Sequence, residues 1–82
     1  MNKLTRDELF LIKLYELAKA LGNPEEEIDR YAVGRAIGQN NKSVDNIVRM
    51  LAQTNFIKKG EGDSIYLTRH GLNLIENLRT NI

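Results

Sequence analysis

The chain has no cysteine, one histidine and one proline among its 82 residues. Without cysteine it can form no disulfide, thiolate nucleophile or cysteine-ligated metal site, and this composition favours a cytoplasmic protein. The longest apolar run covers residues 9–12, far too few to cross a bilayer, and the polar residues before it lack the apolar core of a signal peptide. The single proline leaves no obvious linker, so we expect one domain over residues 1–82.

The same scarcity argues against an enzyme. His70, the single histidine, has no cysteine to pair with and no evident nucleophile, so we expect it to be a surface residue. One histidine cannot make a zinc site, and the acidic residues in segment 25–29 lack the glycine and the alternating oxygen ligands of a calcium loop. Gly60 and Gly62 precede a strand-like pattern rather than a helix opening with Lys-Ser or Lys-Thr, so they form no phosphate loop. We expect no catalytic residue, cofactor or metal.

Charge is nearly balanced overall but uneven along the chain. The net charge is +1, with 41% hydrophobic and 28% charged residues, which is ordinary globular composition. Residues 1–29 carry four Lys/Arg and seven Asp/Glu, whereas residues 30–82 carry eight and four. A basic second part can mark a nucleic-acid-binding face, although so modest an excess is more often an ordinary solvated surface.

A first helix is predicted to begin after Thr5, because Thr5 and Glu8 have the spacing of a capping box. Gly22 and the proline after it give the stop signal. The predicted buried face consists of Phe10, Leu14, Leu17, Ala18 and Leu21. Leu9 and Ile12 fall on another side of this helix, which either a homodimer interface or the last helix and a chain end would cover.

A second helix is predicted over residues 30–37, capped by Asp29 and ended by Gly38. A competing cap at Asn23, with Pro24 at the first helical position, would lengthen it. Its apolar residues are Tyr31, Val33, Ala36 and Ile37.

A third helix is predicted over residues 41–54, capped by Asn40 or Asn41. Asn55 follows, where a left-handed residue is wanted. The inner face comprises Val44, Ile47, Val48 and Leu51, and the opposite, polar face comprises Lys42, Asp45, Asn46, Arg49 and Gln53.

The apolar spacing then changes to two residues. Residues 56–59 and 64–67 flank the glycine-containing segment 60–63, which predicts a β-hairpin. An isolated hairpin is marginal, so its apolar residues, Phe56, Ile57, Ile65 and Leu67, are expected to pack against the helices. Thr68 is predicted to cap a final helix. Its buried face comprises Gly71, Leu74, Ile75 and Leu78, with Ile82 at its end.

This order of helices and hairpin resembles the winged helix-turn-helix DNA-binding domains of the MarR-like superfamily. Residues 33–38 (VGRAIG) are similar to the family's "leucine-alanine-x-x-leucine-glycine" second helix, and residues 43–51 to its recognition helix. Residues 55–57 stand where the family has "glycine-leucine-isoleucine", and residues 67–71 (LTRHG) resemble the "leucine-threonine-x-x-glycine" that closes the wing. The resemblance implies a mostly α fold with a small antiparallel β-hairpin: a three-helix core, a β wing and a C-terminal helix.

The resemblance further implies a small transcriptional regulator that binds double-stranded DNA, with the third helix in the major groove. Arg49 would then pair with guanine, Asn46 with adenine, and Asp45 would accept a hydrogen bond from cytosine. Lys58 and Lys59 would support the wing against the DNA backbone. At the leading end of the helix, contacts to phosphates or base edges would come from Gln39, Asn40, Asn41, Lys42 and Ser43.

Two alternatives stay open. A capped amphipathic helix exposes such a polar stripe to solvent without any ligand, and strand lysines often guard a sheet edge. The negative charges of Asp45, Glu61 and Asp63 favour a rival function, in which the winged helix binds a protein through Leu9 and Ile12 or through the wing, without DNA. If DNA is bound, one protomer offers few phosphate contacts, which favours a homodimer.

Overall fold

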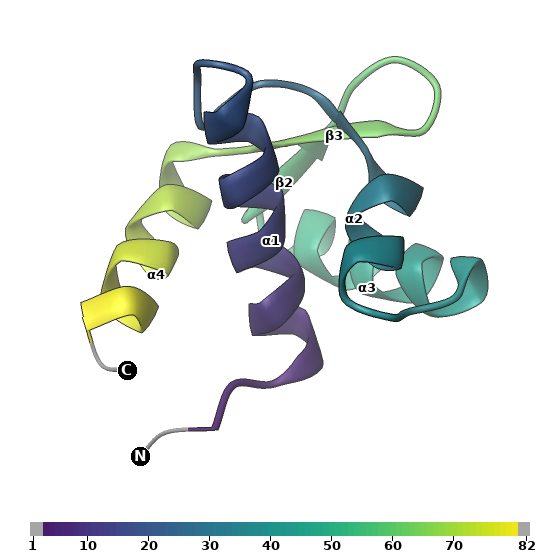
Figure 1. Ribbon diagram of the computed structural model, residues 1–82, viewed down its shortest axis with the longest axis horizontal. Coiled ribbons are helices and arrows are strands. Elements are labelled where there is room, and N and C mark those ends of the chain that lie inside the picture. The colour runs from purple at the N-terminus through teal and green to yellow at the C-terminus, as the bar shows by residue number, and fades with distance from the viewer. Residues whose placement is uncertain (1–2, 81–82) are drawn as a thin grey trace.

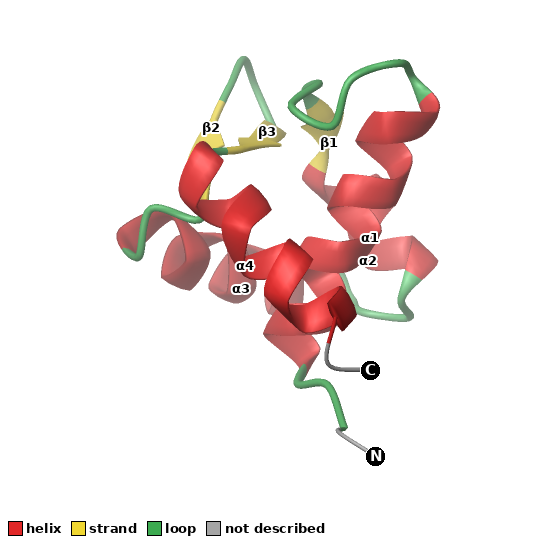
Figure 2. Ribbon diagram, turned by 90° about the vertical axis from the view of Figure 1, so that its left-hand side faces the viewer, coloured by secondary structure: helices red, strands yellow, loops and turns green. Residues whose placement is uncertain are grey.

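The described part of the chain folds into four helices and a small three-stranded antiparallel sheet, whose hairpin lies across one side of the helices (Figure 1). The structure is a computed structural model and describes residues 3–80. Its elements are α1 (Arg6–Ala20), β1 (Ile28–Asp29), α2 (Arg30–Ala36), α3 (Asn41–Gln53), β2 (Ile57–Lys59), β3 (Ser64–Leu67) and α4 (Arg69–Thr80). The strand order is β1-β3-β2, so β2 is an edge strand. Figure 2 shows the strands gathered at one end of the molecule, with α3 and α4 below them and the upper turns of α1 beside β1.

The described helices pack around one apolar core. Its fully or nearly buried members come from every element, and the larger ones are Phe10, Leu11, Leu14, Val33, Val44, Ile47, Val48, Ile57, Ile65, Leu67 and Ile75. No helix in the described part of the chain combines the length and the apolar character that crossing a membrane requires.

The start of α1 confirms the predicted capping box. The Glu8 N–H donates to Thr5 Oγ1 at 3.1 Å, and the Thr5 N–H donates to Glu8 Oε1 at 2.8 Å. The predicted buried face is only partly right, because Leu17 is half-buried and Leu21 is 65% exposed. Leu21 is the C-cap, where the chain already leaves the helix. Leu11 is buried instead, since α4 packs along α1 and widens the covered arc on that side.

The capping of α2 by Asp29 is confirmed, since the Tyr31 N–H donates to Asp29 Oδ1 at 3.1 Å. The competing helix start at Asn23 is wrong: Asn23 Oδ1 accepts from the Glu25 N–H at 2.8 Å within a turn. The chain then extends into β1, which was not predicted. A strand of two residues has no visible period, and its pairing of Ile28 with Ile65 joins distant parts of the chain.

Within α2, Val33 and Gly34 are buried, whereas Ala36, one of its apolar residues, is exposed. The cause is the close approach of α3. A Cβ at Gly34 would run into the Val44 side chain, so the covered side of α2 is turned toward Gly34 and away from Ala36. Gly38, with φ of 75°, then reverses the chain as predicted.

Of the two candidate caps for α3, Asn40 is the one used, because its Oδ1 accepts from the Ser43 N–H at 2.9 Å. The predicted inner face is confirmed in full: Val44, Ile47, Val48 and Leu51 are all buried. Asn55 has φ of 65° after the helix end, again as predicted.

The predicted hairpin is confirmed, with Ile57 opposite Leu67 and Lys59 opposite Ile65. Ile57, Ile65 and Leu67 are buried, whereas Phe56 is half-buried and stacks on the exposed ring of His70, with 4.5 Å between ring centroids.

The final helix begins as predicted, since Thr68 Oγ1 accepts from the Gly71 N–H at 3.0 Å. Gly71 and Ile75 are buried, and Leu74 and Leu78 are half-buried. The predicted helix end at Ile82 lies outside the described residues.

Candidate nucleic-acid interface

The polar face of α3 is displayed away from the core. The opposite face of α3 packs into the core, which leaves the polar face free to contact a ligand. Of the residues predicted to touch DNA, Gln39 and Ser43 are half-buried, and the exposed ones are Asn40, Asn41, Lys42, Asp45, Asn46, Arg49, Lys58 and Lys59. The structure therefore gathers most of the predicted residues on one helix face and its leading end.

Lys58 and Lys59 lie apart from that helix face, on the edge strand β2. Lys58 is opposite Tyr66 and Lys59 is opposite Ile65. Cross-strand partners share a sheet face and neighbouring residues do not, so the two lysines start from opposite faces. Both are exposed, but a ligand on one face of the sheet would meet only one of the two side chains.

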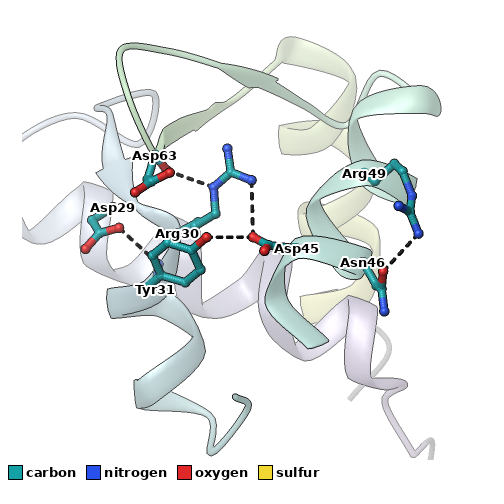
Figure 3. A network of polar contacts seen from close by, with 7 residues as sticks. All are labelled: Asp29, Arg30, Tyr31, Asp45, Asn46, Arg49 and Asp63. Atoms are coloured by element: carbon teal, nitrogen blue, oxygen red, sulfur yellow. Dashed lines mark hydrogen bonds and ion pairs between the residues drawn. The ribbon is translucent and has the colours of Figure 1, made fainter. Parts of the chain in front are cut away.

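Arg49 and Asn46 are engaged with each other on α3. Arg49 Nη2 donates to Asn46 Oδ1 at 2.9 Å (Figure 3). A two-pronged contact to adenine needs both the oxygen and the nitrogen of an asparagine side chain, so Asn46 would have to release Arg49 first. Arg49 keeps its remaining N–H donors, and the contact restrains its guanidinium. The geometry thus suits Arg49 for reading guanine better than it suits Asn46 for reading adenine.

Asp45 is held inside the protein's own network. Its Oδ1 accepts a hydrogen bond from the Tyr31 hydroxyl at 2.8 Å and lies 3.6 Å from Nη1 of Arg30 (Figure 3). The Oδ1 atom of the predicted acceptor for cytosine is therefore engaged by one hydrogen bond and one ion pair within the protein. This pairing also offsets much of the negative charge that Asp45 would present to a phosphate.

Tyr31 responds to the same carboxylate. Its hydrogen bond to Asp45 raises the pKa of the Tyr31 hydroxyl, partial burial and the negative charges of Asp45 and Asp63 raise it further, and Arg30 opposes the shift. Tyr31 and Arg30 were not among the predicted site residues. They lie 14 and 15 residues from Asp45 in the sequence, and no local motif marks such a contact.

The turn of the hairpin is tied to the segment that leads into α2. Arg30 Nε donates to the backbone oxygen of Asp63 at 3.0 Å, and the Arg30 N–H donates to the same oxygen at 3.2 Å. On the other side of the turn, the Glu61 N–H donates to Glu27 Oε1 at 3.4 Å. The hairpin is thereby attached to the helices beyond its sheet pairing.

The remaining charge around α3 and the hairpin is moderately positive. Lys42, Arg49, Lys58 and Lys59 form no ion pair with any residue between 3 and 80. Against these four cations stand the carboxylates of the hairpin turn, Glu61 and Asp63.

Other polar clusters are structural in character. The Arg79 guanidinium donates to the Tyr15 hydroxyl at 3.1 Å and lies 5.2 Å from the centre of its ring, which ties α4 to α1. Within residues 3–80, no group of three or more His, Asp or Glu side chains is placed to hold a metal ion.

Comparisons with known proteins identify no relative of this chain. No protein-family model, no curated protein and no solved structure matches it. What the chain does is therefore inferred from its own side chains.

Proposed function

We propose that this chain is a sequence-specific DNA-binding protein of the winged helix-turn-helix type, a small transcriptional regulator. In this proposal α3 enters the major groove and the β2–β3 hairpin is the wing, which contacts the DNA backbone. The order of elements supports it, since α2, a short turn and α3 are followed directly by the hairpin and then by α4.

The observation that carries the proposal is the exposed polar face of α3. Lys42, Asn46 and Arg49 recur on it at spacings of three and four residues, opposite a face that is completely buried. A helix about 10–12 Å across fits a major groove about 12 Å wide. Arg49, with its restrained guanidinium, is the residue proposed to read a guanine.

The acidic residues are a weaker obstacle to DNA binding than their number suggests. Asp45 is paired with Arg30, and the backbone oxygen of Asp63 is bound by the same arginine. The side chains of Glu61 and Asp63 remain, so the proposed wing would approach the DNA backbone through Lys58 or Lys59 rather than through its turn.

A homodimer is part of the proposal, because one protomer offers cations for only about two phosphate contacts, Lys42 and one of the two hairpin lysines, and a twofold pair would double them. Leu9 is 43% exposed on the outer side of α1, while Ile12 is half-buried. Leu9 is thus the more available of the two residues for such a contact.

A second candidate function is supported by one specific feature, an apolar hollow of about 220 Å³ between α1, α3 and α4. Its apolar lining is Leu11, Met50, Leu51, Phe56 and Leu74, with Asp7, Glu8 and Thr54 beside them, and Met50 is 50% exposed. A protein-interaction module without DNA binding would use such apolar surface. The proposals differ in what they expect of Arg49, which only the first requires.

The test is to select a preferred duplex from a random pool and to measure its binding by Arg49→Ala and Asn46→Ala. Arg49→Ala should weaken binding by about 1–3 kcal/mol and relax preference at one base pair. Asn46→Ala should also weaken it, because Arg49 loses its restraint. Gln53→Ala, on the same exposed face but near the helix end, is the matched control and should bind as the wild type does.

All three positions are exposed, so unfolding free energies should stay within about 0.5 kcal/mol of the wild type. An Arg49→Ala variant that keeps the full sequence preference would remove α3 from the role of reader. A wild type that yields no selected duplex would favour the protein-interaction function.

A further inference from the structure

Among residues 3–80, Arg30 is the one side chain that joins the hairpin turn to the polar face of α3. Its Nε donates to the backbone oxygen of Asp63 at 3.0 Å, and its Nη1 lies 3.6 Å from Asp45 Oδ1 (Figure 3). The side chain is only 11% exposed, although Arg30 is the first residue of α2. Because the Arg30 guanidinium is largely buried and contacts both the turn and α3, it is better placed to hold these two segments together than to contact a ligand.

We propose that Arg30 is a positioning residue, which sets the orientation of the hairpin relative to α3 and neutralises Asp45 without touching DNA itself. The first part concerns the protein alone. Its effect on DNA affinity rests on the proposed function. Arginine is suited to this task because its planar guanidinium holds several donors in a fixed fork, so that one side chain can serve two acceptors in different directions.

The strands of the hairpin are fixed by the pairing with β1 and by the buried side chains of Ile57, Ile65 and Leu67, but its turn has few other attachments and depends on this contact. Beyond the pairing of β3 with β1, the turn is held by the Glu61 N–H on Glu27 at 3.4 Å and by the Arg30 N–H on Asp63 at 3.2 Å. The Arg30 N–H survives any side-chain substitution, so the sheet should remain paired. What is lost with the guanidinium is the link between the turn and α3.

The charge of Asp45 makes a separable contribution. With Arg30 removed, the carboxylate keeps only the Tyr31 hydroxyl, a neutral donor at 2.8 Å. Its negative charge would then stand uncompensated on the face proposed to meet phosphates, where like charges repel. Arg30→Lys keeps a positive charge near Asp45 but cannot serve both acceptors, so it separates neutralisation from orientation.

The first arm of the test needs no DNA. Hydrogen exchange is measured by NMR at the amides of Gly60 and Ser64, which close the turn through bonds of 2.8 and 2.9 Å. Arg30→Ala should speed exchange at both by about fivefold, the factor for a lost hydrogen bond of about 1 kcal/mol. Arg35→Ala, an exposed arginine on the same helix, is the control and should leave the exchange unchanged.

Unchanged exchange at the turn in folded Arg30→Ala would overturn the positioning role, whatever the protein binds. If Arg30→Ala fails to fold, Arg30→Lys replaces it, with the same faster exchange expected and the same unchanged result overturning the role. Equal acceleration throughout the chain would also overturn it, because that marks global destabilisation rather than release of the turn.

The second arm measures binding of a mixed-sequence duplex at low salt. Arg30→Ala should weaken it by about tenfold, which corresponds to about 1.4 kcal/mol. Adding Asp45→Asn to Arg30→Ala should restore the share of the affinity that was lost to the uncompensated charge of Asp45. The loss of affinity caused by Lys58→Ala should be smaller in the Arg30→Ala background than in the wild type, because the hairpin is no longer held in place. Additive effects of Arg30→Ala and Lys58→Ala would contradict the link to the wing.

The two arms separate the failure of each proposal. A wild-type protein that binds no DNA overturns the proposed function and the second arm, and leaves the exchange result to decide whether Arg30 positions the hairpin. A protein that binds DNA and shows unchanged turn exchange in Arg30→Ala keeps the proposed function and loses the positioning role.

Discussion

The close approach of α2 and α3 at Gly34 makes a specific prediction about stability. A Cβ placed at Gly34 would overlap Val44 Cγ2 and lie 3.3 Å from the backbone oxygen of Gln39. Val44 is fully buried, and a β-branched side chain in a helix has one strongly preferred rotamer, so it cannot swing away. Gly34→Ala should therefore strain the helix pair, even though alanine is the better helix former.

Two opposing contributions set the magnitude. Alanine in place of glycine in a helix gains about 1 kcal/mol, whereas a methyl group forced into a packed core costs about 1–3 kcal/mol. The expected net loss is about 1 kcal/mol, or roughly 4–8 °C in melting temperature for a domain of this size. Val44→Ala alone should cost about 2 kcal/mol, because it removes two buried carbons and leaves a cavity.

The double variant Gly34→Ala with Val44→Ala shows whether steric overlap or helix propensity determines the stability change of Gly34→Ala. In Gly34→Ala with Val44→Ala the new methyl group occupies space that the valine has left, so the loss should be smaller than the sum of the single losses by about 2 kcal/mol, the steric cost that is relieved. Urea unfolding followed by circular dichroism measures all four proteins. Ala36→Gly, at an exposed position of the same helix, should add to Val44→Ala without coupling. A Gly34→Ala variant more stable than wild type, or an additive cycle, would refute the reasoning.

The remaining predictions concern Tyr31 and Asn55. Because the pKa of Tyr31 is raised in the folded state, chiefly by its hydrogen bond to Asp45, the folded protein holds this proton more tightly than the unfolded chain. Stability should then fall as pH rises above 10.0, the usual pKa of tyrosine; Tyr31→Phe should flatten this fall in urea unfolding, and an equally steep fall would contradict the assignment. Asn55, at φ of 65°, should tolerate glycine with unchanged or slightly higher stability, whereas alanine should cost about 1 kcal/mol; equal losses for both in thermal unfolding would show that the asparagine side chain matters more than the backbone angle.

Local signals explain why the helix ends could be predicted from the sequence. A cap acts over three or four residues, so Thr5, Asp29 and Asn40 identify their helices without knowledge of what packs on them. The left-handed positions at Asn55 and Gly38 are equally local. The polar face of α3 was predictable for the same reason, because a helix of 13 residues shows a clear period.

The errors arise where burial depends on a distant partner. The apolar residues of α2 do not reveal that Gly34 is buried and Ala36 exposed, because the position of Val44 decides which side of α2 is covered. The two residues of β1 are recognisable only through their pairing with Ile65 and Ser64. In the same way, Arg30 meets Asp63 across 33 positions, and an arginine at the start of a helix carries no sign of such a contact.

The most direct test of the proposed function is fluorescence anisotropy of a labelled mixed-sequence duplex, titrated with the protein at about 50 mM and about 200 mM salt. With about two phosphates neutralised per protomer, by Lys42 and by one of Lys58 and Lys59, affinity should fall by about tenfold between the two conditions, and by about a hundredfold for a dimer. Saturable binding with that salt dependence is the predicted result. No binding at the lower salt by protein shown to be folded would contradict DNA recognition by α3.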